Sequence, residues 1–211
     1  MTEYAIDWAS WYIPLVPSLI AWWYYKNRTV SSEKRYLTFW PRLWASFVDS
    51  IVLWPLGTIF VLILQLDLPL WLFVTVGFLR SLPWMIYNIY LHGTYGQTIG
   101  KMVTSVKIID AKTHNPISFR HAIVRDSIPI LLILALAVYQ AYHLTIGTIS
   151  IDEIINNDPS TGAAWFGLIL FVWWAAEVVT MLTNRKRRAL HDFIAGTVVV
   201  RTNIETLDQE E

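Results

Sequence analysis

The sequence predicts an all-α bundle of five transmembrane helices, with its N-terminus outside and its C-terminus in the cytoplasm, together with a small cytoplasmic β-hairpin or sheet. Composition is the first observation behind this class. Of the 211 residues, 55% are hydrophobic and only 15% are charged, whereas a soluble domain carries about 25% charged residues. The second observation is length, since a helix needs ~20 apolar residues to cross a bilayer. Five stretches approach or exceed that length, namely residues 8–25, 43–66, 68–91, 122–146 and 163–182.

The first apolar stretch is the weakest of the five, because it is short and contains Pro14 and Pro17. A cleaved signal peptide is the alternative interpretation of this stretch. Such a peptide carries positive charge before its apolar run and small residues at its cleavage site, and the sequence shows neither feature. We therefore expect residues 1–35 to form an additional N-terminal transmembrane helix followed by a basic linker.

The Lys and Arg residues outside the apolar stretches all fall on one side of the predicted membrane. They occur between the first and second stretches, between the third and fourth, and after the fifth, while the opposite segments are acidic. Cytoplasmic loops carry the excess of Lys and Arg, which sets the predicted orientation. We expect a multi-pass protein of a bacterial inner (plasma) membrane. The basic residues expected to contact anionic lipid headgroups are Arg185, Lys186, Arg187 and Arg188.

The cytoplasmic segment of residues 92–121 is predicted to contain β-structure. It opens with HGTYGQTIGK, which suits a tight turn, and continues with the β-branched run MVTSVKIID, the turn signal AKTHNP and then ISF. The later run AGTVVVRT is also typical of a strand. Because a lone hairpin is marginal in water, we expect residues 197–202 to pair with it.

The GQTIGK run does not fit a nucleotide-binding loop. A Walker loop begins with a Gly and has Ser or Thr after its Lys, and these two positions are Tyr95 and Met102 here. We expect Gly96 and Gly100 to shape the backbone, with Lys101 at the lipid headgroups.

No residue pattern points to an enzyme or a metal site. Cysteine is absent, which excludes disulfides and thiolate chemistry, and the five His residues lack metal-ligand spacing such as HExxH. No nucleophile–base set is visible, and the 16 Lys and Arg residues are balanced by 16 Asp and Glu residues. We expect no catalytic residues, no metal, no cofactor and no nucleic-acid partner.

Four sequence elements resemble the RDD family, named for one arginine and two aspartates. In order they read RLWASFVDSIVL, GQTIGKMVTSVKIID, ISFRHAIVRDS and RRALHDFIAGTVVV. The resemblance covers residues 36–202 and assigns the family motif to Arg42, Asp49 and Asp192. Ala189 departs from it, standing where a Gly is more usual. The remaining residues 203–211 are acidic, and we expect a disordered tail there.

The resemblance implies a role in transport. Some RDD proteins resemble cation/proton antiporters in activity, and others look like accessory subunits of larger membrane assemblies. We therefore expect a small cation/proton exchanger or part of one, with a non-catalytic membrane subunit or assembly factor as the alternative. Five spans are few for a transporter built from internal repeats, and no repeat is visible, so the expected partners are further copies of the chain or other membrane subunits.

Three ionisable residues, Asp49, Arg80 and Glu177, lie well inside the apolar stretches, where a charged residue costs about 3 kcal/mol at a helix centre. Helical spacing places the two carboxylates at similar depth, and we expect all three side chains to meet in one polar core. In a structural network, Asp49 would pair with Arg80 or Arg42, and Asp192 would pair with Arg42 or with the basic cluster at residues 185–188. In an ion site, two carboxylates would face one arginine, and a proton or monovalent cation would supply the missing charge. An inward-facing Arg42 would remove that deficit.

Overall fold

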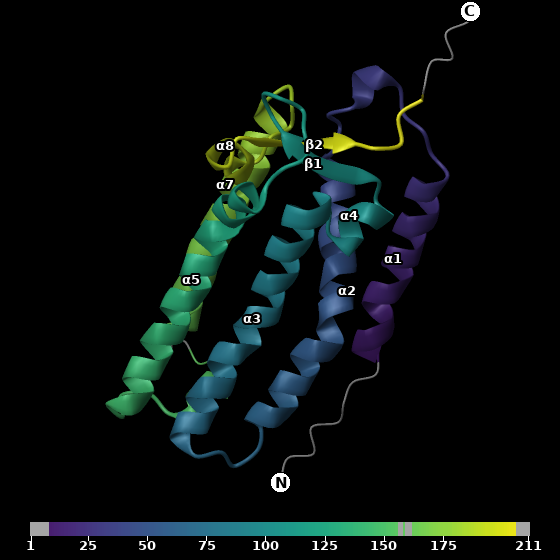
Figure 1. Ribbon diagram of the computed structural model, residues 1–211. Coiled ribbons are helices and arrows are strands. Elements are labelled where there is room, and N and C mark those ends of the chain that lie inside the picture. The colour runs from purple at the N-terminus through teal and green to yellow at the C-terminus, as the bar shows by residue number, and fades with distance from the viewer. Residues whose placement is uncertain (1–8, 156–157, 159–161, 206–211) are drawn as a thin grey trace, which may run out of the picture.

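The computed structural model describes residues 9–155, 158 and 162–205 of the chain. Four long apolar helices form a bundle, and most of the short elements, including the two strands, gather at one end of it (Figure 1). The exception is the short helix α6 (Ile151–Ile155), which packs near Leu64 and Leu68 at the other end. By length and composition, each of the four can cross a membrane. They are α2 (Phe39–Leu64), α3 (Leu70–Tyr95), α5 (Phe119–Thr145) and α7 (Ala163–Thr183). The prediction of a helical membrane protein is confirmed for four of the five expected spans.

Helix α1 (Ala9–Lys26) occupies most of the first predicted span and lies beside α2 (Figure 1). Among the described residues, it does not meet the length and hydropathy that mark the other four as membrane spans. The count of five spans therefore stays a prediction, as does the orientation.

The helices extend beyond the apolar stretches that predicted them. α2 begins at Phe39 rather than at residue 43, and α3 continues to Tyr95 rather than ending at residue 91. Gly96 ends α3 in the left-handed region, with a φ of 69° that favours glycine. The carbonyl of Gly96 then accepts a hydrogen bond from the N–H of Ile108 at 2.8 Å. This hydrogen bond ties the end of α3 to the segment at residues 106–110.

The predicted pairing of the two β-branched runs is confirmed. Strand β1 (Val106–Asp110) pairs antiparallel with β2 (Thr197–Arg201), with Val106 opposite Arg201 (Figure 1). All five residues of β2 are buried, so β2 forms the inside of this end of the protein. The expected hairpin within residues 92–121 is wrong in detail, because its second arm is reduced to a single bridge between Ile109 and Pro116.

The start of the predicted first strand is also wrong. Met102 and Val103 belong to a short helix, α4 (Ile99–Val103). Thr98 caps this helix, because its side-chain oxygen accepts a hydrogen bond from the N–H of Lys101 at 3.3 Å. A polar cap of this kind satisfies one of the free N–H groups of a first turn, and it outweighs the local β-propensity.

The segment after α1 is tied to the end of β2. The N–H of Val30 donates to the carbonyl of Asn203 at 2.9 Å, and the N–H of Glu205 donates back to Val30 at 3.0 Å. A short 3-10 helix (Ser32–Lys34) follows in this linker. The first residues of the predicted acidic tail are thus held against the basic linker, and residues 206–211 lie outside the described residues.

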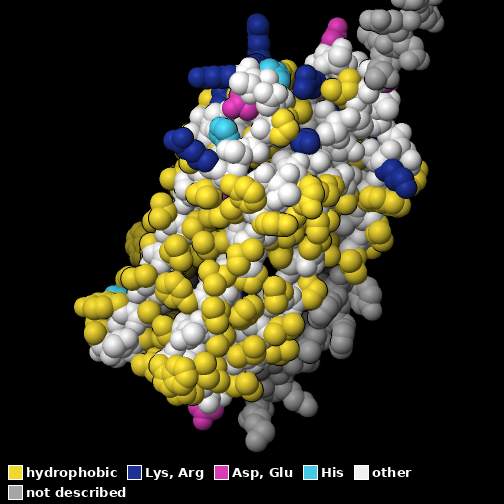
Figure 2. All heavy atoms as spheres, viewed as in Figure 1, with side chains coloured by type: hydrophobic (Ala, Val, Ile, Leu, Met, Phe, Trp, Pro, Cys, Tyr) yellow, Lys and Arg dark blue, Asp and Glu magenta, His cyan; other side chains and the backbone are white. Residues whose placement is uncertain are grey.

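The surface divides into an apolar band and a basic end. Hydrophobic side chains cover the length of the bundle, and Lys and Arg gather at the end that carries the sheet (Figure 2). Only 6–17% of the most apolar window of each spanning helix is buried inside the protein. The outward apolar faces therefore require lipid around them.

Candidate functional site

The site lies where the sheet end joins the bundle, and its centre is Asp192. This residue belongs to the first turn of α8 (Leu190–Ile194) and is fully buried. Its Oδ2 accepts a hydrogen bond from the N–H of Ala189 at 2.9 Å. The carboxylate thus caps the start of the helix.

Two arginines from different helices bind the carboxylate of Asp192. Nη1 of Arg42, in α2, lies 2.7 Å from Oδ2, and Nη1 of Arg125, in α5, contacts Oδ1. Thr197 at the start of β2 also donates to Oδ1 at 3.2 Å. Burial alone would raise the pKa of Asp192, but the guanidinium groups of Arg125 and Arg42 outweigh burial and hold that pKa well below its usual range. Asp192 therefore stays ionised and joins α2, α5, α8 and β2.

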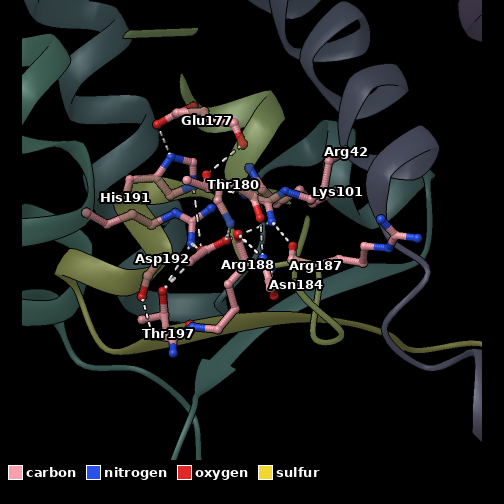
Figure 3. Close-up of polar contacts among 12 residues, drawn as sticks. Arg42, Lys101, Glu177, Thr180, Asn184, Arg187, Arg188, His191, Asp192 and Thr197 are labelled. Carbon is pink, nitrogen blue, oxygen red and sulfur yellow. Dashed lines mark hydrogen bonds and ion pairs between the residues drawn. The ribbon is translucent and has the colours of Figure 1, made fainter. Parts of the chain in front are cut away.

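His191 connects this centre to Glu177 on α7 (Figure 3). Nη2 of Arg42 lies 2.9 Å from Nε2 of His191, and Nδ1 of His191 contacts the carboxylate of Glu177. Because a guanidinium has only donors, Nε2 must be the unprotonated acceptor and Nδ1 must donate to Glu177. Burial and the nearby charge of Arg125 lower the pKa of His191, which agrees with a neutral ring.

A second group repeats the same order of a cation, an imidazole and a carboxylate. Nζ of Lys101 lies 3.0 Å from Nε2 of His92, and Nδ1 of His92 lies 3.1 Å from Oδ2 of Asp126. An ammonium also has only donors, so His92 accepts at Nε2 and donates to Asp126. Each of the two rings therefore has one fixed tautomer and keeps a carboxylate partnered.

Asp49 has a different role from the one predicted for it. Its carboxylate accepts three hydrogen bonds, from Tyr87 Oη at 2.5 Å, Thr98 Oγ1 at 2.6 Å and the N–H of Gly100 at 2.7 Å. A Cβ on Gly100 would lie 2.0 Å from the carbonyl oxygen of Ala45, so only glycine permits this approach. Asp49 fastens α4 to α2 and α3, and it forms no ion pair among the described residues.

Arg80 does not join the other two residues, and the predicted convergence is wrong. Its side chain is exposed and lines a different cavity, together with Leu64 and Leu144. Arg80 lies 15 residues before the end of α3 at Tyr95, which is about 22 Å at 1.5 Å per residue. Glu177, by contrast, is close to the sheet end through His191. The helical spacing gave the faces correctly but could not give how far α3 extends past its apolar stretch.

The charges of the site balance. Arg42 is buried and turned inward, at 8% exposed, which is the condition that removes the predicted charge deficit. Arg188 also points inward and donates to the carbonyls of Thr197 and Asp192, both at 2.8 Å. This described region holds four cations and four carboxylates, namely Arg42, Lys101, Arg125 and Arg188 with Asp49, Asp126, Glu177 and Asp192. Of these described cations, Arg42 and Arg125 contact a carboxylate directly, and both contact Asp192.

The other basic residues divide into two groups. Arg185 and Lys186 are exposed at the sheet end, and their contact with lipid headgroups stays a prediction. Arg187 donates to the carbonyl of Leu182 at 2.6 Å, and Arg188 is used inside the protein. The ammonium of Lys101, which we expected at the lipid headgroups, turns inward to His92.

Sequence reasoning missed Arg125, His92 and Asp126 as members of the site. Arg125 and Asp126 stood next to each other near the start of an apolar stretch, which is itself a signal that both have buried partners. Their partners come from α3 and α8, and helix packing alone brings these elements to α5.

The comparison with known protein families decides the affiliation. The model of the RDD family matches residues 36–196. The chain belongs to the RDD family. The matched part of this RDD protein includes Arg42, Asp49 and Asp192, the residues to which the resemblance assigned the family's motif. Their geometry shows that the two aspartates do different work, since Asp192 binds two arginines and Asp49 binds α4.

A bacterial relative supports the membrane assignment. The chain is 29% identical over 97 residues to the "uncharacterized membrane protein YteJ" of Bacillus subtilis (strain 168), an alignment that spans 43% of this chain and 59% of that relative. No solved structure matches the chain. The protein is a membrane protein of the RDD family with several apolar helices.

Proposed function

We propose that this RDD protein is a non-catalytic subunit or assembly factor of a larger membrane complex. The observation that carries the proposal is the balance of four cations and four carboxylates, each of which has a partner. A balanced cluster has no missing charge for a transported cation to supply. Removing one partner of a buried ion pair costs about 3–5 kcal/mol, so the two ion pairs that Asp192 makes with Arg42 and Arg125 act as a lock within this cluster.

The lock holds one end of the protein in a defined shape. Asp192 joins two spanning helices to α8 and β2, and Asp49 fastens α4 to two spanning helices. The sheet, α4 and α8 are thereby fixed to the bundle, on the end where Lys and Arg gather (Figure 2). This end is the surface that we propose docks further copies of the chain or other membrane subunits.

The proposed topology has five spans, with α1 as the fifth, the N-terminus outside and the sheet end in the cytoplasm of a bacterial inner membrane. It is supported by the gathering of Lys and Arg at the sheet end, since cytoplasmic segments carry the excess of these residues. Reporter fusions at residues 1 and 211 should report opposite sides of the membrane. Fusions that report the same side would refute the topology.

Photo-crosslinking in native membranes tests the docking proposal. A crosslinker placed at the exposed Lys112, which lies just after β1, should give defined products larger than the single chain. The matched control is Trp71, which is 69% exposed and lies in the first turn of α3 at the far end of the bundle. Equal products from both positions, or none from Lys112, would contradict docking at the sheet end.

Cation/proton exchange is the second candidate, and it is favoured by the position of Glu177. This carboxylate lines a cavity and is held by a neutral imidazole rather than by a guanidinium. In an exchanger, Glu177 would carry the proton, and the hydrogen bond from His191 would respond to the charge of Glu177. Asp49 and Arg80 have no part in this version. Proton-driven flux lost in Glu177→Gln and retained in Asp49→Asn would establish it over the subunit proposal.

A further inference from the structure

A cavity of about 290 Å³ lies between α2 and α7, beside the charge cluster. Its walls are apolar and aromatic, with Trp40 from α2 and Trp174 and Val178 from α7. Trp40 and Trp174 are 62% and 52% exposed on the outside of the bundle. The cavity therefore opens sideways, towards the surface that faces lipid.

The inner side of the cavity is electropositive. Arg42, Lys101 and Arg125 line it, and Glu177 is the carboxylate among its lining residues. Asp192, which balances two of these cations, is fully buried behind them and does not line the cavity. A ligand in the cavity therefore faces three positive groups and one negative group.

Arg125 has donors that the protein does not use. It is 3% exposed, and its hydrogen bonds to Asp192 and Thr197 both leave from Nη1. A guanidinium carries five N–H donors, and among the described residues no acceptor is bound by its Nε or Nη2. Because Arg125 lines the cavity, anionic oxygens placed there can accept from these groups.

We propose that this cavity binds the phosphate of a phospholipid headgroup, with the acyl chains along its apolar wall. Phosphate oxygens match the fork of a guanidinium and the point charge of a lysine. The proposal goes beyond the subunit function and does not depend on it. Arg42 lies one turn inside α2, at the basic end, which is the depth of headgroups in the proposed topology. Trp174 lies nine residues before the end of α7 at Thr183, about 14 Å deeper, where acyl chains are found.

The test measures binding of short-chain phosphatidylglycerol to the full-length protein in a neutral maltoside detergent, with inorganic phosphate as the second probe. Wild-type protein should bind the lipid saturably at one molecule per chain, and inorganic phosphate at the same concentration should not compete. Saturable binding of phosphate alone would mean a site for a free anion and would overturn the lipid assignment.

Two pairs of variants locate the binding. Val178→Trp fills the cavity and should weaken lipid binding at least about tenfold, whereas Val179→Trp, at a neighbouring position that is 58% exposed, should leave it unchanged. Lys101→Gln should weaken binding about fivefold, and Lys112→Gln, at an exposed position outside the cavity, should not. Lys101→Gln is independent of the bulky change, so it keeps the test decisive if Val178→Trp fails to fold.

The outcomes separate clearly. Equal affinity in all four variants, or no saturable binding by wild-type protein, would overturn the lipid site. Neither result bears on the subunit proposal, which is measured by crosslinking at the sheet end and by ion flux.

Discussion

The lock at Asp192 predicts a large and specific loss of stability in Asp192→Asn. The substitution keeps the volume of the side chain but removes the charge that Arg42 and Arg125 share. Both guanidinium groups are more than 90% buried, so neither can recover its lost partner from water. Breaking a buried ion pair costs about 3–5 kcal/mol, and the second arginine places this variant at the upper end.

Thermal unfolding of the purified protein in detergent measures the effect. For a chain of this length, 1 kcal/mol changes Tm by about 2–4 °C, so a loss of about 5 kcal/mol should lower Tm by about 10–20 °C. Asp152→Asn is the matched control, because it removes the same charge from an exposed position in the short helix α6 (Ile151–Ile155). Its Tm should stay within about 2 °C of wild type, since surface substitutions rarely change stability by more than about 0.5 kcal/mol.

A second substitution separates lost pairing from lost packing. In Asp192→Asn with Arg125→Gln, one unpaired buried charge is gone, so the double variant should be more stable than the sum of the single effects by about 1–3 kcal/mol. Single and double effects that add, or an Asp192→Asn variant as stable as Asp152→Asn, would refute the lock.

Three further predictions concern α4 and its surroundings. Gly100→Ala should destabilise the protein by about 1–3 kcal/mol in thermal unfolding, because its Cβ would lie 2.0 Å from a backbone carbonyl oxygen of α2. The control Gly167→Ala should be neutral or stabilising in the same assay, because a Cβ there would have no atom within 4 Å. Burial lowers the pKa of Lys101 to about 8 from its ordinary value of 10.5. Between these pH values the unfolded chain binds more protons than the folded protein, so the free energy of unfolding should rise as pH is raised from 8 to 10.5. Denaturant titrations should lose this pH dependence in Lys101→Met, and an unchanged dependence would contradict the lowered pKa. Asp49→Asn should lower stability by about 1–3 kcal/mol, because an amide cannot accept all three hydrogen bonds that Asp49 receives; an unchanged Tm would argue against its role in fastening α4.

The sequence was sufficient to predict the elements that are marked by long apolar stretches or by β-branched runs. Four spanning helices follow from apolar length, and the pairing of β1 with β2 follows from two β-branched runs on one side of the membrane. The helix ends were harder, because the first turn of α2 consists of residues such as Trp40 and Arg42 that lie outside the apolar stretch. Helix α4 escaped prediction because its start is fixed by Asp49, which is distant in the sequence.

The site was predicted only in part, because residues that are distant in the sequence come together to form it. Arg42 and Asp192 were correctly paired as one alternative, since both belong to the motif of the family. Arg125 was not, because nothing in its own helix shows that α8 packs against it. Arg80 was placed in the site on depth alone, and depth does not say which end of a long helix a residue is near.

Ion flux in proteoliposomes is the most direct test of the claim that a protein with this balanced cluster transports no protons or cations. Purified wild-type protein, reconstituted at known density and with a pH gradient imposed, should give proton, sodium and potassium fluxes equal to those of empty liposomes, and Glu177→Gln should give the same values. Saturable proton-driven flux of either cation by wild-type protein, abolished in Glu177→Gln, would contradict the subunit proposal and establish Glu177 as the exchanging carboxylate.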